Sequence, residues 1–399
     1  MIPSTLTSTV NSHQPPWQDH PQLDLVRNVL ETTTVIASPV ETDQLARRLR
    51  AVEAGHASVL QMGDCAEDPA HCTPAHVHRK LDQLTASAGA VATPTGLPVV
   101  QVGRIAGQFA KPRSKATETV GDREVVTYRG HMVNLPDSDE VSRTPDPLRI
   151  LMGYLTSRQV AATIAGFNRG RALEDRVWTS HEALLLDYEH PMMRSGSDER
   201  TYLTSTHWPW IGERTRNVDG PHVATLAHIA NPSACKVGPT ATEGDLVALC
   251  SRLDPYREPG KLALITRMGA QHIRTRLPAL MSAVRAAGHR VLWICDPMHG
   301  NTLSAGDGTK TRVVDDVIDE MTGFVGVADQ TGTRVHGLHL ETTHLSDVSE
   351  CVWSSADLAS ARPSSPLCDP RLNPEQTAAV VHAWGEMLAR HYRAVETPS

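Results

Sequence analysis

Short apolar runs alternate with helix-length segments along most of the chain. Eight runs stand out, at residues 57–62, 97–102, 176–181, 206–211, 234–239, 262–267, 290–295 and 335–341. Nearly continuous apolar runs of this length predict strands that are covered by helices. Because eight parallel strands close a (β/α)8 barrel, we predict this α/β fold. The rival, an open doubly wound sheet, is disfavoured because no strand is followed by a GxGxxG turn.

Helical periodicity fills the segments around these runs. Two helices are expected before the first strand, at residues 23–31 and 42–54, with Thr42 as the N-cap of the second. Others are expected at residues 148–170, 272–288, 312–328 and 374–394. The predicted organisation is an N-terminal helical extension, an arm with helices over residues 1–55, followed by one catalytic barrel domain with a C-terminal helix over residues 56–399.

Charge and composition exclude several classes of protein. The formal net charge is −7 and there is no basic block, so we expect binding neither to nucleic acid nor to a membrane surface. No apolar run approaches the roughly 18–20 residues that span a bilayer, and the N-terminus lacks the order of a signal peptide, so we expect a cytoplasmic protein. The seven scattered cysteines indicate thiols rather than a disulfide framework.

Polar residues collect directly after the predicted strands, where a (β/α)8 barrel carries its active site. Arginine binds phosphate and carboxylate through two hydrogen bonds, and lysine adds a point charge. Any one of these cations could be an ordinary solvated surface charge. That explanation does not account well for a whole set of cations placed just beyond buried strands in an acidic protein. The set predicts one or two phosphorylated substrates; its members are Arg104, Lys111, Arg113, Arg214, Lys236 and Arg267.

Four potential metal ligands are expected on the same active-site face: Cys65, His299, Glu341 and Asp369, the last in the motif LCDPRLN. A thiolate, an imidazole and two carboxylates suit a borderline divalent ion such as Mn²⁺, Fe²⁺, Co²⁺ or Zn²⁺. Taken singly, Cys65 is also explained as a packed thiol, and His299 as a helix cap or a core histidine. A nucleophilic role for Cys65 is disfavoured because the acids beside it would raise its thiol pKa.

A second group of potential ligands lies in the segment HCTPAHVH: His71, Cys72, His76 and His78. This segment is expected to begin a helix after Pro74. Residues two positions apart on a helix do not face each other, so His76 and His78 would not converge on one ion. The local spacing therefore does not favour a metal site here.

Several longer motifs occur in a fixed order: GDCAE, GRIAGQFAKPRS, YRGHMVN, TSHEALLLDYE, WIGERTR, KVGPT, LITRMGA, CDPMHGNT and CDPRLN. Together they closely resemble the class II (plant-type) 3-deoxy-D-arabino-heptulosonate 7-phosphate (DAHP) synthases, from about Asp43 to Arg390. The resemblance implies a (β/α)8 barrel that condenses phosphoenolpyruvate with erythrose 4-phosphate and releases phosphate, at the entry to a shikimate-type pathway. It also implies a divalent metal cofactor, Mn²⁺ ahead of Co²⁺, Fe²⁺ or Zn²⁺.

The resemblance also implies residue roles. The metal ligands it implies are the four named above. It places phosphoenolpyruvate against Arg104, Trp210, Glu213, Lys236 and Arg267, and the aldose phosphate against Lys111, Arg113, Ser114, Glu182 and Arg214. Two of these residues would be catalytic: Lys111 would protonate the new alkoxide, and Glu213 would orient the attacking water.

The chain departs from the family pattern at a few places. His131 in YRGHMVN stands where an acid is expected, Met62 replaces a glycine, and the loop after HLETTH diverges. All three are expected near the site. The segment between Lys111 and Glu182 is shorter than in long members, whose inserted helices help bind aromatic amino acids, so feedback inhibition is not expected. Short forms of this kind resemble members of secondary-metabolite pathways.

Two alternatives stay open at the level of the sequence. An aminoDAHP synthase would take an amino or imino erythrose phosphate, and His131 with the altered loop motivates it. A non-catalytic homologue would act as a partner-binding or regulatory subunit, which the intact ligands and cations argue against. The resemblance further implies a homo-oligomer, either a dimer or a tetramer, and chorismate mutase as a partner to be tested.

Overall fold

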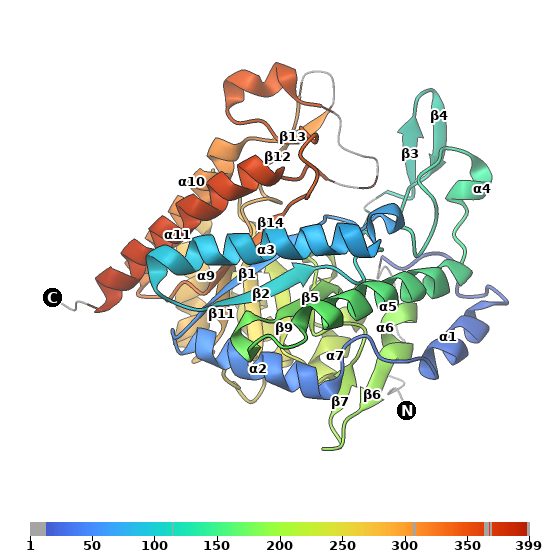
Figure 1. Ribbon diagram of the computed structural model, residues 1–399, viewed down its shortest axis with the longest axis horizontal. Coiled ribbons are helices and arrows are strands. Elements are labelled where there is room, and N and C mark those ends of the chain that lie inside the picture. Colours follow the sequence, from blue (N-terminus) through green and yellow to red (C-terminus); the bar gives the residue numbers. More distant parts are fainter. Residues whose placement is uncertain (1–12, 114, 306–308, 363–366, 368, 397–399) are drawn as a thin grey trace.

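Eight parallel strands close into a barrel at the centre of the computed structural model, which describes residues 13–113, 115–305, 309–362, 367 and 369–396 (Figure 1). Around the barrel the strands follow the order β1, β14, β11, β10, β9, β8, β5, β2. Each overlaps one predicted apolar run, so the predicted (β/α)8 barrel is confirmed. Their bounds are β1 Ser58–Gly63, β2 Val99–Arg104, β5 Val177–Glu182, β8 Trp208–Ile211, β9 Ser233–Val237, β10 Leu262–Thr266, β11 Leu292–Cys295 and β14 Gly337–Glu341.

Alternation along the strands divides the core into two parts. Outward residues such as Leu60 and Met62 pack in a large cluster with the surrounding helices. Inward residues such as Val59, Val102 and Ile265 form a separate cluster inside the barrel. Successive side chains of a strand point to opposite faces, so residues two positions further along also point inward. The barrel interior is therefore apolar at the beginning of the strands, and polar side chains such as Arg104 take over at their ends.

Helix α2 (Pro39–Glu53) closes the end of the barrel at which the strands begin (Figure 1). Its residues Leu45, Leu49 and Val52 are fully buried and belong to the cluster inside the barrel. The prediction of Thr42 as the N-cap was wrong. Ser38 is the cap: its hydroxyl accepts a hydrogen bond from the Glu41 amide, and the Glu41 carboxylate accepts one from the Ser38 amide, which is a capping box.

The other helices cover the outside of the barrel. The long helices α3 and α11 lie side by side across one face of it (Figure 1). The predicted helices at residues 23–31, 148–170, 272–288, 312–328 and 374–394 are all present. The bounds are α1 Leu23–Glu31, α3 Pro74–Thr95, α4 Glu140–Arg143, α5 Leu148–Asn168, α6 Leu186–Glu189, α7 Pro221–His228, α8 Glu243–Leu253, α9 Ile273–Ala286, α10 Val314–Thr331 and α11 Pro374–Glu396.

Three small antiparallel pairs project from the loops. β3 (Thr117–Val120) pairs with β4 (Arg123–Val126) after β2, and β12 (Thr302–Ser304) pairs with β13 (Lys310–Arg312) after β11. β6 (Met193–Ser195) pairs with β7 (Thr201–Leu203) on the way to β8. In Figure 1 the first two pairs stand on the same side of the molecule, away from α2. The loops that follow β2 and β11 thus extend the barrel end at which the active site is predicted.

Two expectations from composition bear on the described residues. The thiols of Cys72, Cys235, Cys250, Cys295 and Cys351 are free and buried, as expected of packing residues. Among the helices that the structure describes, none has the length and apolar character that crossing a bilayer demands.

Candidate active site

A cavity of about 700 Å³ opens at the end of the barrel opposite α2. It is lined by strand ends and by the loops that follow them, including the β3–β4 hairpin. Every predicted site residue that the structure describes lies in its wall; Ser114 falls outside the described residues. These residues are Cys65, Arg104, Lys111, Arg113, Glu182, Trp210, Glu213, Arg214, Lys236, Arg267, His299, Glu341 and Asp369.

Three buried side chains from strand ends form what we call the floor of the cavity: Arg104, Lys236 and Glu341. Arg104 donates from Nη2 to Oε1 of Glu341 at 2.9 Å. The Trp210 ring lies 5.0 Å from the Arg104 guanidinium carbon and 5.8 Å from Nζ of Lys236, within reach of cation–π attraction. The floor is therefore a preassembled group of charges with low access to water.

Glu341 is surrounded by cations and donors. Its Oε1 lies 3.0 Å from His299 Nε2, and its Oε2 accepts a hydrogen bond from Arg312 at 2.8 Å. Burial alone would raise the pKa of this carboxyl, but His299, Arg312 and Arg104 hold it well below its ordinary range. Glu341 is thus an anion at neutral pH despite being fully buried.

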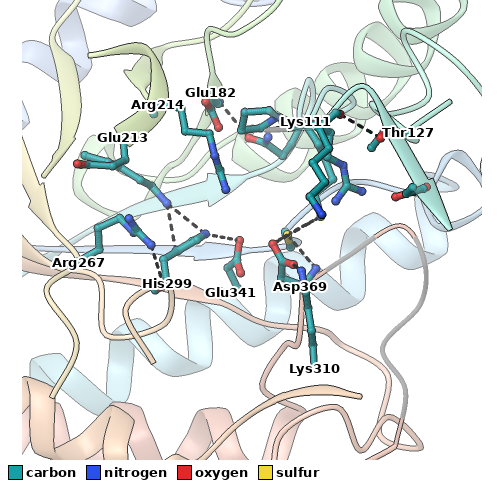
Figure 2. A pocket seen from close by; sticks show the side chains of 18 of the residues that line it. Lys111, Thr127, Glu182, Glu213, Arg214, Arg267, His299, Lys310, Glu341 and Asp369 are labelled. Atoms are coloured by element: carbon teal, nitrogen blue, oxygen red, sulfur yellow. Dashed lines mark hydrogen bonds and ion pairs between the residues drawn. The ribbon is translucent and has the colours of Figure 1, made fainter. Parts of the chain in front are cut away.

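Cys65 forms a second pair with Asp369, which lies between Glu341 and Lys310 in the view of Figure 2. The Cys65 sulfur is 3.8 Å from Oδ2 of Asp369 and accepts a hydrogen bond from the Asp369 amide at 3.3 Å. Lys111 Nζ is 3.3 Å from the sulfur and 3.7 Å from the carboxylate. Lys310, from β13, lies 3.3 Å from the other carboxylate oxygen. We call Lys310, Asp369 and the β3–β4 hairpin the rim.

The acids next to Cys65 in sequence turn away from it. Asp64 pairs with Lys80 at 2.7 Å and with Arg371 at 2.9 Å. Glu67 accepts hydrogen bonds from the backbone amides of residues 106–108. The argument that these acids act on the Cys65 thiol was therefore wrong, because both have partners of their own, and the charges beside the sulfur are the Lys111 ammonium and the Asp369 carboxylate.

Glu182 and Arg267 present polar atoms to the cavity that have no hydrogen-bond partner among the described residues: Oε1 of Glu182 and Nε of Arg267. Burial raises the pKa of Glu182 above its ordinary value, although Lys236, Arg214 and Arg104 oppose the shift. Buried polar atoms without partners are costly, so they indicate a place for a polar ligand.

The four predicted metal ligands are present as two pairs, Cys65 with Asp369 and His299 with Glu341. Among the residues that the structure describes, no three His, Cys, Asp or Glu side chains already surround one point. The donor set still fits a divalent ion. His299 Nδ1 bonds to Asp296 at 2.7 Å, which directs Nε2 toward Glu341 and the cavity, as the outer partner of a histidine ligand does.

The class-II DAHP synthetase family model matches this chain over residues 1–174 and 165–383. The chain belongs to this family. A DAHP synthetase relative from Pseudomonas fluorescens, named a probable phospho-2-dehydro-3-deoxyheptonate aldolase, is 46% identical over 376 residues, which are 93% of this chain and 94% of the relative. A phospho-2-dehydro-3-deoxyheptonate aldolase from Streptomyces coelicolor is 38% identical and covers 94% of this chain and 95% of its own.

One further relative agrees with this assignment, and a solved structure agrees with the fold. A Mycolicibacterium smegmatis enzyme of the same name is 37% identical and covers 94% of this chain and 92% of its own. The solved structure of the Francisella tularensis phospho-2-dehydro-3-deoxyheptonate aldolase aligns with a TM-score of 0.51 over 96% of both chains. Its sequence identity is 14%, so this likeness concerns the fold alone.

Several residues around the DAHP synthetase cavity were missed by sequence reasoning. Asp296 holds both Lys236, at 3.0 Å, and His299, and its place in the motif CDPMHGNT was the available signal. His339 lies two positions before Glu341 on β14, so alternation could have found it; its Nε2 accepts from Arg104 at 2.6 Å. Arg312 and Lys310 follow no barrel strand and gave no signal.

The family departures at Met62 and His131 lie outside the lining of the cavity. Met62 points outward from β1 into the cluster shared with the helices. His131 bonds to the Tyr128 hydroxyl at 2.7 Å, and its carbonyl oxygen accepts a hydrogen bond from Arg149. Neither side chain therefore lines the cavity, and an effect of these two departures on the site stays a prediction.

Proposed function

We propose that this chain condenses phosphoenolpyruvate with erythrose 4-phosphate to give DAHP and inorganic phosphate. The observation that carries the proposal is a single cavity with cations on both sides of the His299–Glu341 pair. Figure 2 shows Arg214 and Arg267 on one side and Lys111 on the other. Two phosphates and a carboxylate repel one another, so an enzyme that joins them needs such a distribution of positive charge.

Phosphoenolpyruvate is assigned to the inner side of the cavity. Arg104, Lys236 and Arg267 would neutralise its phosphate and carboxylate, with Trp210 holding the first two in place by its ring face. The Nε of Arg267 has no hydrogen-bond partner among the described residues, so it is available to donate to a phosphate or carboxylate oxygen. The aldose phosphate is assigned to Lys111, Arg113, Ser114, Glu182 and Arg214.

The proposed reaction forms a bond between C3 of phosphoenolpyruvate and the aldehyde carbon of the aldose. Lys111 would donate a proton to the new alkoxide oxygen, since its ammonium lies at the cavity wall beside the Cys65–Asp369 pair. Water then adds at C2, and phosphate leaves. Glu213 would orient that water: its Oε2 accepts from the Gly238 amide at 2.6 Å, which fixes the carboxylate at the cavity wall.

A divalent ion would be held by Cys65, His299, Glu341 and Asp369, with Mn²⁺ the first candidate. When bound, the ion supplies a Lewis acid for the aldehyde carbonyl. The residues of the chain hold the substrates, exclude water from the floor and move the proton.

We further propose a short form of the enzyme that serves a specialised pathway. The alignments with the Streptomyces and Mycolicibacterium relatives run over 429 and 431 positions, more than the 399 residues of this chain, so those relatives carry insertions. In long members such insertions would carry the aromatic amino acid sites. The assay below, repeated with phenylalanine, tyrosine and tryptophan, should show unchanged rates; inhibition by any of them contradicts this part.

The test of the reaction is a substrate panel with product masses. Phosphoenolpyruvate is expected to be consumed with erythrose 4-phosphate and to give the mass of DAHP. Turnover only with an amino or imino analogue would transfer the proposal to aminoDAHP synthesis. If phosphoenolpyruvate is not consumed with any aldose, the alternative that this chain is a non-catalytic homologue would be favoured.

The assignment of Arg267 is tested by calorimetry. Arg267→Ala should weaken phosphoenolpyruvate binding about 10- to 100-fold, because a hydrogen bond to a charged group contributes about 1.5–3 kcal/mol. Arg274→Ala is the matched control, since Arg274 pairs with Asp319 on the exposed surface outside the cavity. Equal affinity of wild type and Arg267→Ala would refute the assignment.

A further inference from the structure

Three histidine rings gather beside α3, outside the cavity described above. His71 precedes α3, His76 lies in its first turn, and His344 follows β14. The ring centres are 4.9 Å apart for His71 and His76, 4.9 Å for His76 and His344, and 6.0 Å for His71 and His344. The chain thus folds back over 268 residues to bring a third imidazole to the two near the helix start.

Two of these ring separations, both 4.9 Å, match those around a metal ion, and the third, 6.0 Å, is wider. With metal–nitrogen bonds of about 2.0–2.1 Å in a tetrahedral shell, the centres of two bound imidazoles stand about 5 Å apart and their donor nitrogens about 3.4 Å apart. His76 Nδ1 and His344 Nε2 are 2.6 Å apart, in direct contact. The rings need to rotate slightly apart to admit an ion, and the half-exposed position of His76 leaves room for that rotation.

The fold makes little other use of these rings. Among the described residues, the rings of His76 and His344 hydrogen-bond to each other and to no other side chain. His344 Nδ1, the ring nitrogen that does not contact His76, is buried without a hydrogen-bond partner among the described residues, so no second bond holds this ring in place. The positive charge of Lys80 is neutralised by its ion pair with Asp64 at 2.7 Å.

The other members of the HCTPAHVH segment point elsewhere. His78 lies against the Phe167 ring, with ring centres 6.1 Å apart. The Cys72 thiol donates to the Asp68 carbonyl oxygen at 3.3 Å, and burial with neighbouring Glu67 raises its pKa well above the ordinary value. His76 and His78 thus do not converge in the structure, as expected. The third imidazole of the group comes instead from His344, which is distant in sequence.

We propose that His71, His76 and His344 form a second divalent metal site, separate from the Cys65 set and suited to an imidazole-preferring ion such as Zn²⁺ or Cu²⁺. Three protein ligands leave the remaining coordination position to solvent. The site would tie the segment that carries Cys65 to the segment that follows Glu341. It stands on residues that take no part in the proposed reaction.

The experiment counts bound ions. Full-length protein is stripped with a chelator, dialysed against Zn²⁺ and analysed by atomic emission. His344→Ala and His76→Ala should each hold one Zn²⁺ fewer per chain than wild type, and His78→Ala, on the same helix but outside the group, should hold as many as wild type. Equal counts for His344→Ala and wild type overturn the proposal. His344→Gln keeps a polar side chain for folding; retention of the ion by this variant also overturns the site.

Comparison with Cys65→Ser separates this site from the proposed catalytic ion. Two sites give wild type two ions, with one lost in His344→Ala and a different one lost in Cys65→Ser. Wild type holding a single ion that His344→Ala loses and Cys65→Ser keeps supports the histidine site and contradicts the catalytic one. The reverse pattern overturns the histidine site alone.

Discussion

The floor and the rim of the cavity carry similar charges but are built differently. Arg104 and Glu341 are 3% and 0% exposed, whereas the side chains of Lys310 and Asp369 are 53% and 29% exposed. The floor cations and carboxylates bond to one another with little water between them. At the rim, solvent weakens the attraction of the same kind of pair.

The difference follows from where each residue sits on the barrel. The ladder places Gly63 of β1 opposite Arg104 of β2 and opposite Glu341 of β14. A shift by one residue would turn these side chains out of the barrel, so the same pairing that closes the fold fixes the floor. The rim is carried by loops and hairpins, whose position depends on few contacts. We therefore expect changes at the floor to affect both activity and stability, and changes at the rim to affect activity alone.

Metal removal should produce the largest effect, because the proposed ion joins His299 and Glu341 to Cys65 and Asp369 near the rim. Treatment with a strong chelator should reduce condensation to background, and Mn²⁺ should restore it. Cys65→Ser should raise the Mn²⁺ concentration needed for half-maximal rate or abolish turnover. Full activity of wild type in thoroughly demetallated buffer, with residual metal measured by emission, would refute the metal role.

Arg104→Met tests the floor. The change leaves Glu341 without one of its cations and leaves His339 Nε2 without its donor. Removing one member of a buried ion pair costs about 3–5 kcal/mol, so the free energy of unfolding should fall by about that amount. Loss of one preorganised charge near the reacting groups should lower kcat about 10²- to 10³-fold.

The control for this variant is Arg104→Lys, which keeps the charge but loses the planar fork. It should recover part of the stability and little of the rate, because a single ammonium cannot reach Glu341, the Asp64 carbonyl and His339 together. An Arg104→Met protein with wild-type stability in urea would contradict the distinction drawn between floor and rim.

The sequence predicted the barrel and the floor because both depend on the same short-range signals. Apolar runs marked the eight strands, and the polar residue that follows each run marked the cavity. Arg104 and Glu341 follow directly from that rule, since each ends a buried strand, and Lys236 is the last residue but one of β9. Alternation and charge do not tell which residue binds which substrate or the metal. Those roles were inferred from the family motifs, and they stay predictions.

What the sequence did not predict depends on contacts between distant segments. Thr42 and Ser38 are both good capping residues, and only the reciprocal contact with Glu41 decides for Ser38. Lys310 reaches Asp369 because the β12–β13 hairpin folds over the cavity, which no local pattern encodes. The convergence of His344 with His76 has the same cause, since the loop after β14 lies beside the start of α3.

Lys310→Ala is the smallest change and the sharpest test of the rim. Because Lys310 is half exposed, loss of its contact with Asp369 should change the free energy of unfolding by no more than about 0.5 kcal/mol. It contributes to the positive charge met by an incoming phosphate, so the KM of the aldose should rise by about 3- to 10-fold while kcat changes little, and added salt should narrow the difference. Arg274→Ala is the matched control, because Arg274 is a half-exposed cation that pairs with a carboxylate, Asp319, outside the rim and the cavity lining. A fall in the free energy of unfolding as large as that of Arg104→Met would contradict the distinction between floor and rim. An exposed ion pair screened by solvent cannot contribute several kcal/mol to stability.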